Sequence, residues 1–220
     1  MPQYTSGAIN EVLIGTGVLY VADRTTSSLA FPGDNSGAWA DVDTAKWRDI
    51  GYSEDGWTLE MDRTFEDILV AEEVDPIKTI KTAQEARLMG ELSQASLKNL
   101  SIAMGQNDAH VSENDSNFAA GYDVVITPET NSFAELAGLL ITEGPAGADR
   151  HLEMPRMVSV GAFSMSHAKA PQKVVIATEF KLLVPDATFH VGNAGGKYKL
   201  FRIVDNTNDT TCLLYTSPSP

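Results

Sequence analysis

Residues 47–105 decide the fold, and they read WRDIGYSEDGWTLEMDRTFEDILVAEEVDPIKTIKTAQEARLMGELSQASLKNLSIAMG. Within them Trp57, Leu59 and Met61 alternate with polar residues, which is the period of two typical of a half-buried strand. Pro76 interrupts the pattern, and residues 77–82 are β-like again. We therefore expect a strand on each side of an acidic excursion with an apolar centre. A short strand over 47–52 and a turn over 53–56 should precede them.

Residues 83–105 could form one helix by propensity alone, but Gly90 lies in the middle of an alternating run. A strand that continues to about Ser93 fits this alternation better. A short helix should follow, starting at Ala95-Ser96 and ending at Gly105, with Leu97, Leu100 and Met104 as its buried stripe.

The rest of the chain alternates between β-rich segments and polar loops. Residues 12–22 predict a strand, whereas residues 23–45 predict a long surface loop with scattered apolar points such as Phe31. Many short strands with one helix indicate a mainly β fold, a sandwich or barrel with one short flanking α-helix and long loops. The later strands are expected at residues 122–127, 139–142, 152–156, 158–166, 174–184 and 198–204.

The domain organisation that we predict is simple. Residues 1–11 form a polar amino-terminal arm, and residues 12–211 form a single β-sandwich domain. The amino terminus has no basic start and no apolar core, so we expect no signal peptide. No apolar run approaches the roughly 20 residues that span a bilayer.

The charge is unevenly distributed along the chain. Sixteen basic and 30 acidic residues give a net charge of −14, which argues against holding nucleic-acid phosphates. Between residues 41 and 75, twelve acids face only Lys46, Arg48 and Arg63, so this segment contributes −9. The twelve acids are Asp41, Asp43, Asp49, Glu54, Asp55, Glu60, Asp62, Glu66, Asp67, Glu72, Glu73 and Asp75. Solubility alone would explain an acidic surface, but it does not explain the clustering.

Motifs for catalysis or cofactor binding are not found. Gly15-Thr16-Gly17 lacks a third glycine, and residues 192–197 (GNAGGK) are too short for a phosphate loop and are followed by Tyr198. The loop NDAHVSENDSN has oxygen ligands without the order of an EF-hand. We expect no catalytic residue, no cofactor and no metal, and hence no enzyme. Four histidines stand singly and are expected at the surface: His110, His151, His167 and His190.

Five segments carry a family resemblance through their order and spacing. They are IGTGVLYVA (14–22), residues 47–82, LSQASLKNLSIAMG (92–105), LLITEGPAGADRHLEMPRMVSVGAFSMS (139–166) and KVVIATEFKLLVPD (173–186). Together they resemble the major tail tube proteins of long-tailed, siphovirus-type bacteriophages over about residues 12–186. The resemblance implies a β-sandwich that assembles as hexameric rings, which stack into the tube through which DNA leaves the capsid.

The resemblance also implies partners and a location. The partners would be other copies of this chain, the tape measure protein, the terminator and the baseplate hub, with DNA passing through unbound and no membrane involved. The location would be the virion tail, assembled in the cytoplasm of the host bacterium. Two other readings stay open: another ring-forming virion sandwich such as a tail terminator or head–tail connector, and a monomeric binding module.

Two sets of residues are candidates for building such an assembly. The apolar tip Phe65, Ile68, Leu69 and Val70, enclosed by acids, is suited to packing on a neighbour. The second set would supply charge that faces the lumen or a ring contact, and it consists of Glu60, Asp62, Glu66 and Asp67.

The last nine residues, CLLYTSPSP (212–220), contain the only cysteine and resemble nothing upstream. They match the translation of a transposase adapter used in sequencing libraries, so we expect them to be adapter read-through and not native. A natural Ser/Pro-rich tail is the alternative. Sequencing the source locus should reveal a different carboxyl end, whereas genomic DNA that encodes CLLYTSPSP would contradict this expectation.

Overall fold

The computed structural model describes residues 17–26, 29–32, 42–69, 75–112, 122–126, 133–143, 149–164, 174–185 and 200–205. The predicted amino-terminal arm (1–11) and the segment 212–220 lie outside these residues, as do Trp39 and the loop residues 192–197.

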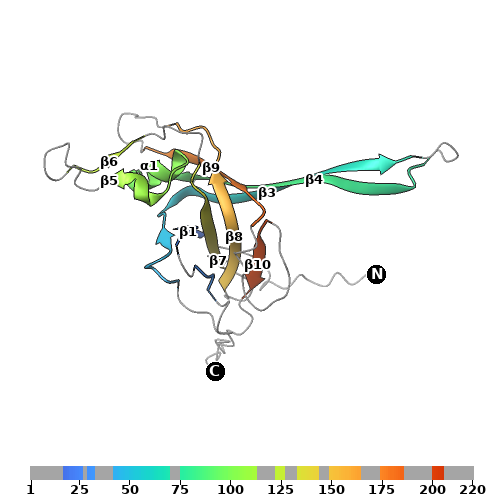
Figure 1. The fold of residues 1–220 in the computed structure, drawn as a ribbon. Coiled ribbons are helices and arrows are strands. Elements are labelled where there is room, and N and C mark those ends of the chain that lie inside the picture. The colour runs from blue at the N-terminus through green and yellow to red at the C-terminus, as the bar shows by residue number, and fades with distance from the viewer. Residues whose placement is uncertain are drawn as a thin grey trace, which may run out of the picture.

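The fold is mainly β, as predicted, with one sheet of eight antiparallel strands, a two-stranded sheet and one α-helix (Figure 1). The large sheet has the order β2-β1-β7-β8-β9-β4-β3, and β10 also pairs with β8. The elements are β1 (Val18–Asp23), β2 (Arg48–Asp49), β3 (Ser53–Ile68), β4 (Lys78–Leu92), α1 (Leu97–Ala103), the 3-10 helix η2 (Asp108–His110), β5 (Val111–Ser112), β6 (Val124–Val125), β7 (Leu136–Glu143), β8 (Asp149–Ser159), β9 (Ile176–Leu182) and β10 (Arg202–Asp205).

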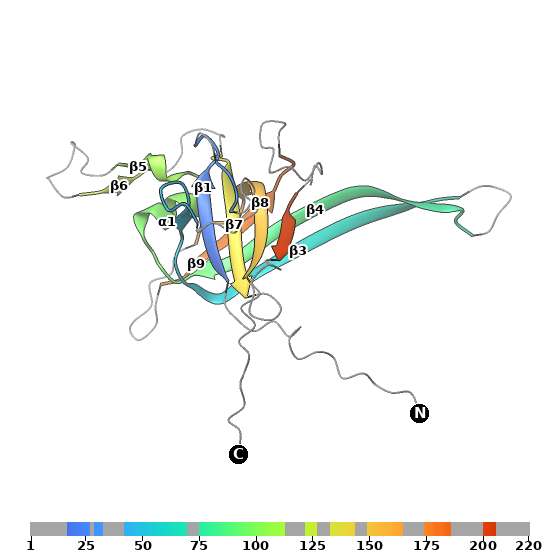
Figure 2. The same cartoon turned by 90° about the horizontal axis from the view of Figure 1, so that it is seen from below.

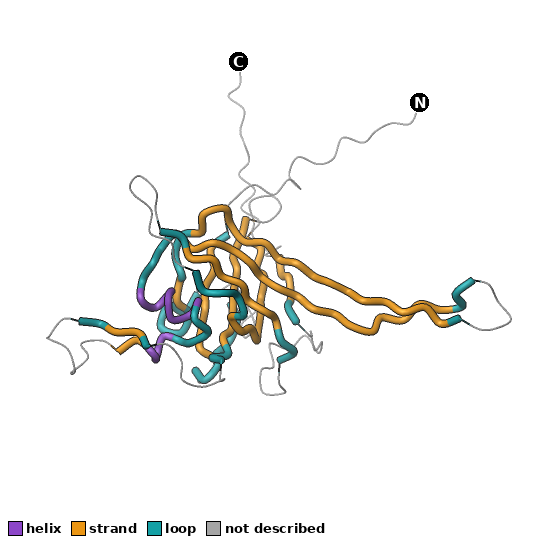
Figure 3. The backbone as a smooth tube through the Cα atoms, turned by 90° about the horizontal axis from the view of Figure 1, so that it is seen from above, coloured by secondary structure: helices purple, strands orange, loops and turns teal. Residues whose placement is uncertain are grey.

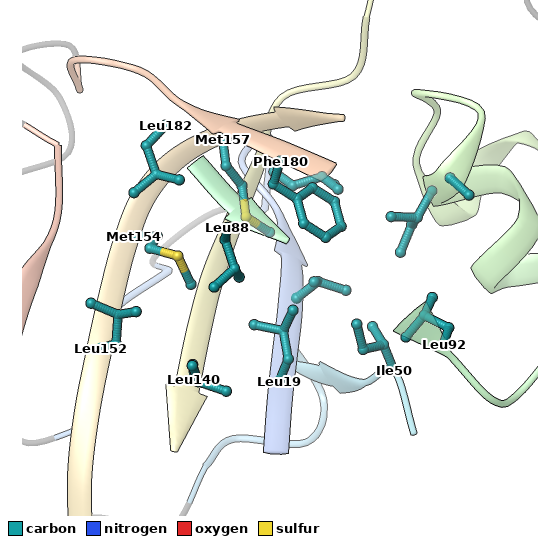
Figure 4. Packing of buried hydrophobic residues seen from close by; sticks show 14 of the residues in the cluster. Leu19, Ile50, Leu88, Leu92, Leu140, Leu152, Met154, Met157, Phe180 and Leu182 are labelled. Atoms are coloured by element: carbon teal, nitrogen blue, oxygen red, sulfur yellow. The ribbon is translucent and has the colours of Figure 1, made fainter. Parts of the chain in front are cut away.

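Strand β8 lets this single sheet fold over on itself. One edge of β8 pairs with β7, while its other edge pairs with β10 over residues 150–153 and with β9 over residues 157–159. The layer of β1, β7 and β8 therefore faces the layer of β9 and β4 across a shared core. Figure 4 shows this packing, in which the buried residues include Leu19, Leu88, Leu140, Leu152, Met154, Met157 and Phe180.

A second, smaller apolar cluster lies on the opposite face of β1 and β7. Phe31 and Trp47 are buried there, with ring centroids 5.2 Å apart, and they pack with Ala22, Ala137 and Leu139. The Trp47 indole Nε1 donates a hydrogen bond to the Ala30 carbonyl oxygen at 3.1 Å. The prediction that residues 23–45 form a surface loop with scattered apolar points is thus wrong at Phe31, because Trp47 supplies a distant partner for its ring.

The predicted break between strand and helix is confirmed. Strand β4 ends at Leu92, and α1 begins after Ser96, whose Oγ accepts a hydrogen bond from the Asn99 backbone N–H at 3.2 Å. Gly105 has a φ of 81°, the left-handed conformation expected of a residue that ends a helix.

The predicted buried stripe of the helix is wrong. Leu97, Leu100 and Met104 are only half-buried, whereas Asn99, Ser101, Ile102 and Ala103 are buried. Hydrogen bonds set this orientation: the Asn99 Nδ2 donates to the carbonyl oxygens of Ile50 (2.8 Å) and Gln94 (2.9 Å), and the Arg48 guanidinium donates to the Asn99 Oδ1 at 2.8 Å. In a helix of seven residues these bonds outweigh the apolar periodicity.

Several strand limits also differ from the predictions. The expected turn at residues 53–56 lies inside β3 as an irregularity in its pairing with β4, with Gly56 at a φ of 84°. The expected strand at 47–52 is reduced to Arg48 and Asp49. The strands expected at 152–156 and 158–166 form the single strand β8, which ends at Ser159. Pairing with β7 continues on both sides of Pro155, which lies in an irregularity of β8 opposite Ala137.

Two ion pairs attach β10 to β8. The Arg202 Nε donates to the buried Glu153 carboxylate at 2.7 Å, and the Arg150 guanidinium bonds both oxygens of Asp205 at 2.6 and 2.8 Å. The Arg150 bonds lower the pKa of Asp205. A four-residue strand is held by paired charges as well as by its backbone ladder.

His151 lies between these ion pairs and is 4% exposed, so the prediction of a surface histidine is wrong for this residue. Burial lowers its pKa from 6.5 to about 4, against a smaller opposite effect from Asp149. The neutral imidazole is therefore the form that the fold accepts. Of the other three histidines, His167 and His190 lie outside the described residues.

This burial predicts a pH dependence of stability. Between pH 6.5 and about 4 the unfolded state binds a proton at His151 that the folded state does not, so the free energy of unfolding falls as the pH is lowered. The full window corresponds to about 3 kcal/mol. Chemical denaturation at several pH values should show a clearly flatter dependence for His151→Gln than for the wild type. Equal slopes between pH 7 and 5 would contradict the assignment.

Candidate assembly surface

A hairpin arm projects from the sandwich, and it contains most of the residues that the sequence singled out. Strands β3 and β4 leave the body together and extend well beyond it, as the cartoons and the backbone trace show (Figures 1, 2 and 3). We define the hairpin arm as residues 62–69 and 75–84. All eighteen of these described residues are exposed to solvent.

The base of the hairpin is anchored by Trp57 and Leu59, which pack against the main core. Trp57 lies tilted against the buried Phe180, with ring centroids 6.4 Å apart. Gly90 makes room for this indole, because a Cβ at position 90 would come within 2.5 Å of the Trp57 ring. The alternation predicted for Trp57, Leu59 and Met61 is confirmed, since all three are half-buried while residues 58, 60 and 62 are exposed.

Beyond Met61 the backbone ladder continues without side-chain burial. Asp62 pairs with Glu85, Thr64 with Ala83, and Ile68 with Lys78. Thr82 is an extra residue opposite the step from Thr64 to Phe65, which makes a β-bulge in the arm. The arm is therefore a two-stranded ribbon that water reaches on both faces.

The predicted apolar tip is exposed in the arm. Phe65 is 56% and Leu69 64% exposed, and Ile68 is also exposed, while Val70 lies outside the described residues. Sequence reasoning missed two partners on the returning strand, Ile77 (57% exposed) and Ile80. The β-like run 77–82 could have indicated them, because an antiparallel strand that returns from the tip lies beside it.

The four predicted charges are all exposed, but they do not share one face. Side chains alternate along β3, so Glu60, Asp62 and Glu66 lie on one face together with Ile68. Asp67 lies on the opposite face with Phe65, and its Oδ1 accepts a hydrogen bond from the Thr79 hydroxyl at 2.6 Å. The set is therefore split three to one.

Near the body, the Glu60 face merges with a network of ion pairs on β4 and β9. Arg87 bonds Glu85 at 2.7 Å and Glu179 at 2.5 Å, and the Lys181 Nζ lies 3.2 Å from Glu85. Hydrogen bonds from Lys181 and then Arg87 lower the pKa of Glu85, and those to Glu179 and Glu85 raise the pKa of Arg87. These four charges balance. On the hairpin this face also carries Glu60, Asp62 and Glu66, opposed by the exposed Lys78, which pairs with Ile68, so these residues sum to −2.

A second apolar surface lies at the carboxyl end of α1. Residues Ala103–Gly105 and Ser159–Gly161, together with Phe133 and Phe163, line an open pocket of about 370 Å³. Phe133, Val160 and Phe163 are exposed at its rim.

Candidate metal ligands do not gather in the described residues. Among them, no group of three His, Cys, Asp or Glu side chains could hold a metal ion. No helix in the described part of the chain is long and apolar enough to cross a bilayer.

Comparisons with known proteins find similarity to solved structures. No protein-family model and no curated protein matches the chain. A chain from "Cryo-EM structure of the anti-feeding prophage (AFP) baseplate, 6-fold symmetrised" is 9% identical, with 88% of this chain and 95% of that chain covered and a TM-score of 0.45. A similarity of this size identifies neither the family nor the function of this chain.

Proposed function

We propose that this chain is a structural virion protein that forms hexameric rings, which stack into the tail tube of a long-tailed bacteriophage and conduct DNA during ejection. The hairpin arm is the observation that carries the proposal. The hexameric ring and the stacked tube are inferred from the sequence resemblance. The protein acts through its surfaces and performs no reaction.

The hairpin arm is poorly suited to a protein that stays alone. An isolated two-stranded ribbon is marginally stable in water, and this one exposes Phe65, Ile68, Leu69, Ile77 and Ile80. Burying one such side chain completely contributes roughly 1.5–3 kcal/mol, so covering these five partly exposed residues would contribute on the order of 5 kcal/mol. Assembly with a neighbouring subunit that covers the arm would gain most of this free energy.

Strand β3 also offers a free edge to a neighbour. It ends the strand order of the large sheet, so within the described residues one of its sides has no strand beside it. Long exposed edges invite pairing with another chain, and proteins that remain monomeric usually block them. A ring of identical subunits would use such an edge.

The charge distribution suits a conduit for DNA. Glu60, Asp62 and Glu66 outnumber Lys78 on one face of the hairpin and leave it with a net negative charge. DNA carries about one negative charge per 1.7 Å of its axis. Six copies at −14 each carry −84 per ring, and the share of this charge that faces the lumen would let DNA pass without adhering. Other tail proteins, namely the tape measure, terminator and baseplate hub, are the remaining partners that this role implies.

Electron microscopy of the purified protein tests the proposal. The protein, expressed with the carboxyl end that its genomic locus encodes, should form long tubes in negative stain. High salt should favour the tubes because it screens the repulsion between acidic subunits. Isolated rings that never stack would indicate a terminator or connector. Monomers that persist at high concentration and high salt would contradict self-assembly and favour a binding module.

Charge reversal tests the proposed lining. Glu60→Lys with Asp62→Lys should slow or reduce DNA delivery by assembled particles, because Lys attracts phosphates that the native acids repel. The single variants Glu60→Lys and Asp62→Lys are compared with Asp67→Lys on the opposite face, which changes the charge by the same amount and should have a smaller effect than either. Unchanged DNA delivery and unchanged tube length in the double variant would contradict the proposal that Glu60 and Asp62 line the lumen.

A further inference from the structure

The pocket beside α1 is built to receive an apolar side chain. Gly105 has a φ of 81°, and a Cβ there would come within 2.8 Å of the Phe133 ring. Gly161 lies equally close to β9, where a Cβ would meet the Glu179 backbone nitrogen at 3.0 Å. Both glycines therefore keep the walls of the pocket close together and apolar.

The lining argues against a polar small molecule. The eight lining residues are Ala103, Met104, Gly105, Phe133, Ser159, Val160, Gly161 and Phe163, and none of them is ionisable. Ser159 is the only one with a polar side chain, and its Oγ already donates to the Ala103 carbonyl oxygen at 3.3 Å. Ligand sites usually add several convergent polar groups to an apolar pocket, which this one lacks.

The hairpin arm of the same molecule cannot reach this pocket. Gly161 of the pocket lies against Glu179, which pairs with Met89 of β4, and Ile80 lies nine residues before Met89. At 3.3 Å per residue, Ile80 is about 30 Å away from that part of the strand. Figures 1 and 2 show the arm pointing away from α1 in both views. The two exposed apolar surfaces thus lie at opposite ends of the molecule.

We infer that the pocket lined by Phe133, Val160 and Phe163 receives the hairpin arm of a second copy of this chain. Phe65, Leu69 and Ile77 are the most exposed apolar side chains of the described arm, and they are the ones that enter. Aromatic rings on both sides, Phe65 facing Phe133 and Phe163, allow offset or edge-to-face packing. The inference rests on the proposed self-assembly and names the surface that accepts the arm.

The size of the arm suits an interface between copies. Its eighteen exposed described residues approach the 20–30 residues that each side of a standard interface contributes. Two different surfaces meet in this contact, so each copy still offers a free arm and a free pocket. Such a head-to-tail contact repeats from copy to copy, closing into a ring or continuing as a stack.

Cross-linking between two differently tagged chains tests the contact. Both chains have the carboxyl end that the genomic locus encodes, with any cysteine in it replaced by Ser, so that each has only one introduced cysteine; one carries Phe65→Cys and the other Phe163→Cys. After mixing, dissociation and reassembly, a short bis-maleimide should give a heterodimer in at least about tenfold greater yield than a control pair. In the control pair, Ile203→Cys replaces Phe163→Cys, because Ile203 is also exposed but lies on β10.

The outcomes separate this contact from the proposed function. A wild-type chain that assembles, while the Phe65/Phe163 pair cross-links no better than the control, overturns the contact and leaves assembly intact. Mass spectrometry that finds another segment or another protein linked to position 163 also overturns it. A wild-type chain that stays monomeric overturns the proposed function and the contact together. Thermal melts of both cysteine variants should match the wild type, since both phenylalanines are exposed.

Discussion

Backbone pairing between β3 and β4 continues from Trp57 to Ile68, whereas the burial of β3 side chains stops at Met61. The projecting arm and its exposed apolar side chains both follow from this difference between backbone pairing and side-chain burial. The first part of the hairpin belongs to the core through Trp57, Leu59 and the space left at Gly90. The second part keeps its hydrogen-bonded ladder but has no layer behind it, and a ladder without a covering layer is only marginally stable.

The body of the protein holds the base of this hairpin through strand pairing, ring packing and ion pairs. Strand β9 pairs with β4 from Arg87 to Leu92, and the Phe180 ring on β9 packs against Trp57. The ion pairs of Arg87 and Lys181 with Glu85 and Glu179 join the two strands on the other face. Because exposed ion pairs contribute little stability, we regard this network as maintaining alignment and neutral charge at the point where the arm leaves the body.

Local patterns in the sequence predicted correctly the features that depend on neighbouring residues, namely strand faces and helix ends. Alternation placed the correct faces of Trp57, Leu59 and Met61, and Gly90 together with Ser96 separated the strand from the helix correctly. Features decided by distant partners were missed. The burial of Phe31 depends on Trp47, that of His151 on the strands beside it, and the orientation of α1 on Arg48 and the Ile50 carbonyl.

The candidate surface could likewise be predicted only in part. The apolar tip was visible as a run enclosed by acids, but its projection from the body was not, because a strand exposed on both faces has no periodic signature. The alternation along β3 separates Asp67 from Glu60, Asp62 and Glu66, which a charge count cannot reveal. The pocket that we propose as the acceptor joins residues from α1, the end of β8 and Phe133, so no single stretch of sequence contains it.

Hydrogen exchange along the hairpin arm tests the central claim most directly. Backbone amides of residues 62–68 and 78–84 should exchange rapidly in the monomer and become strongly protected in the assembled protein. The amides of β7 and β8 should be protected to the same extent in both states. An arm that is equally protected in the monomer and in the assembly, or that remains unprotected in both, would contradict the view that a neighbouring subunit completes this part of the fold.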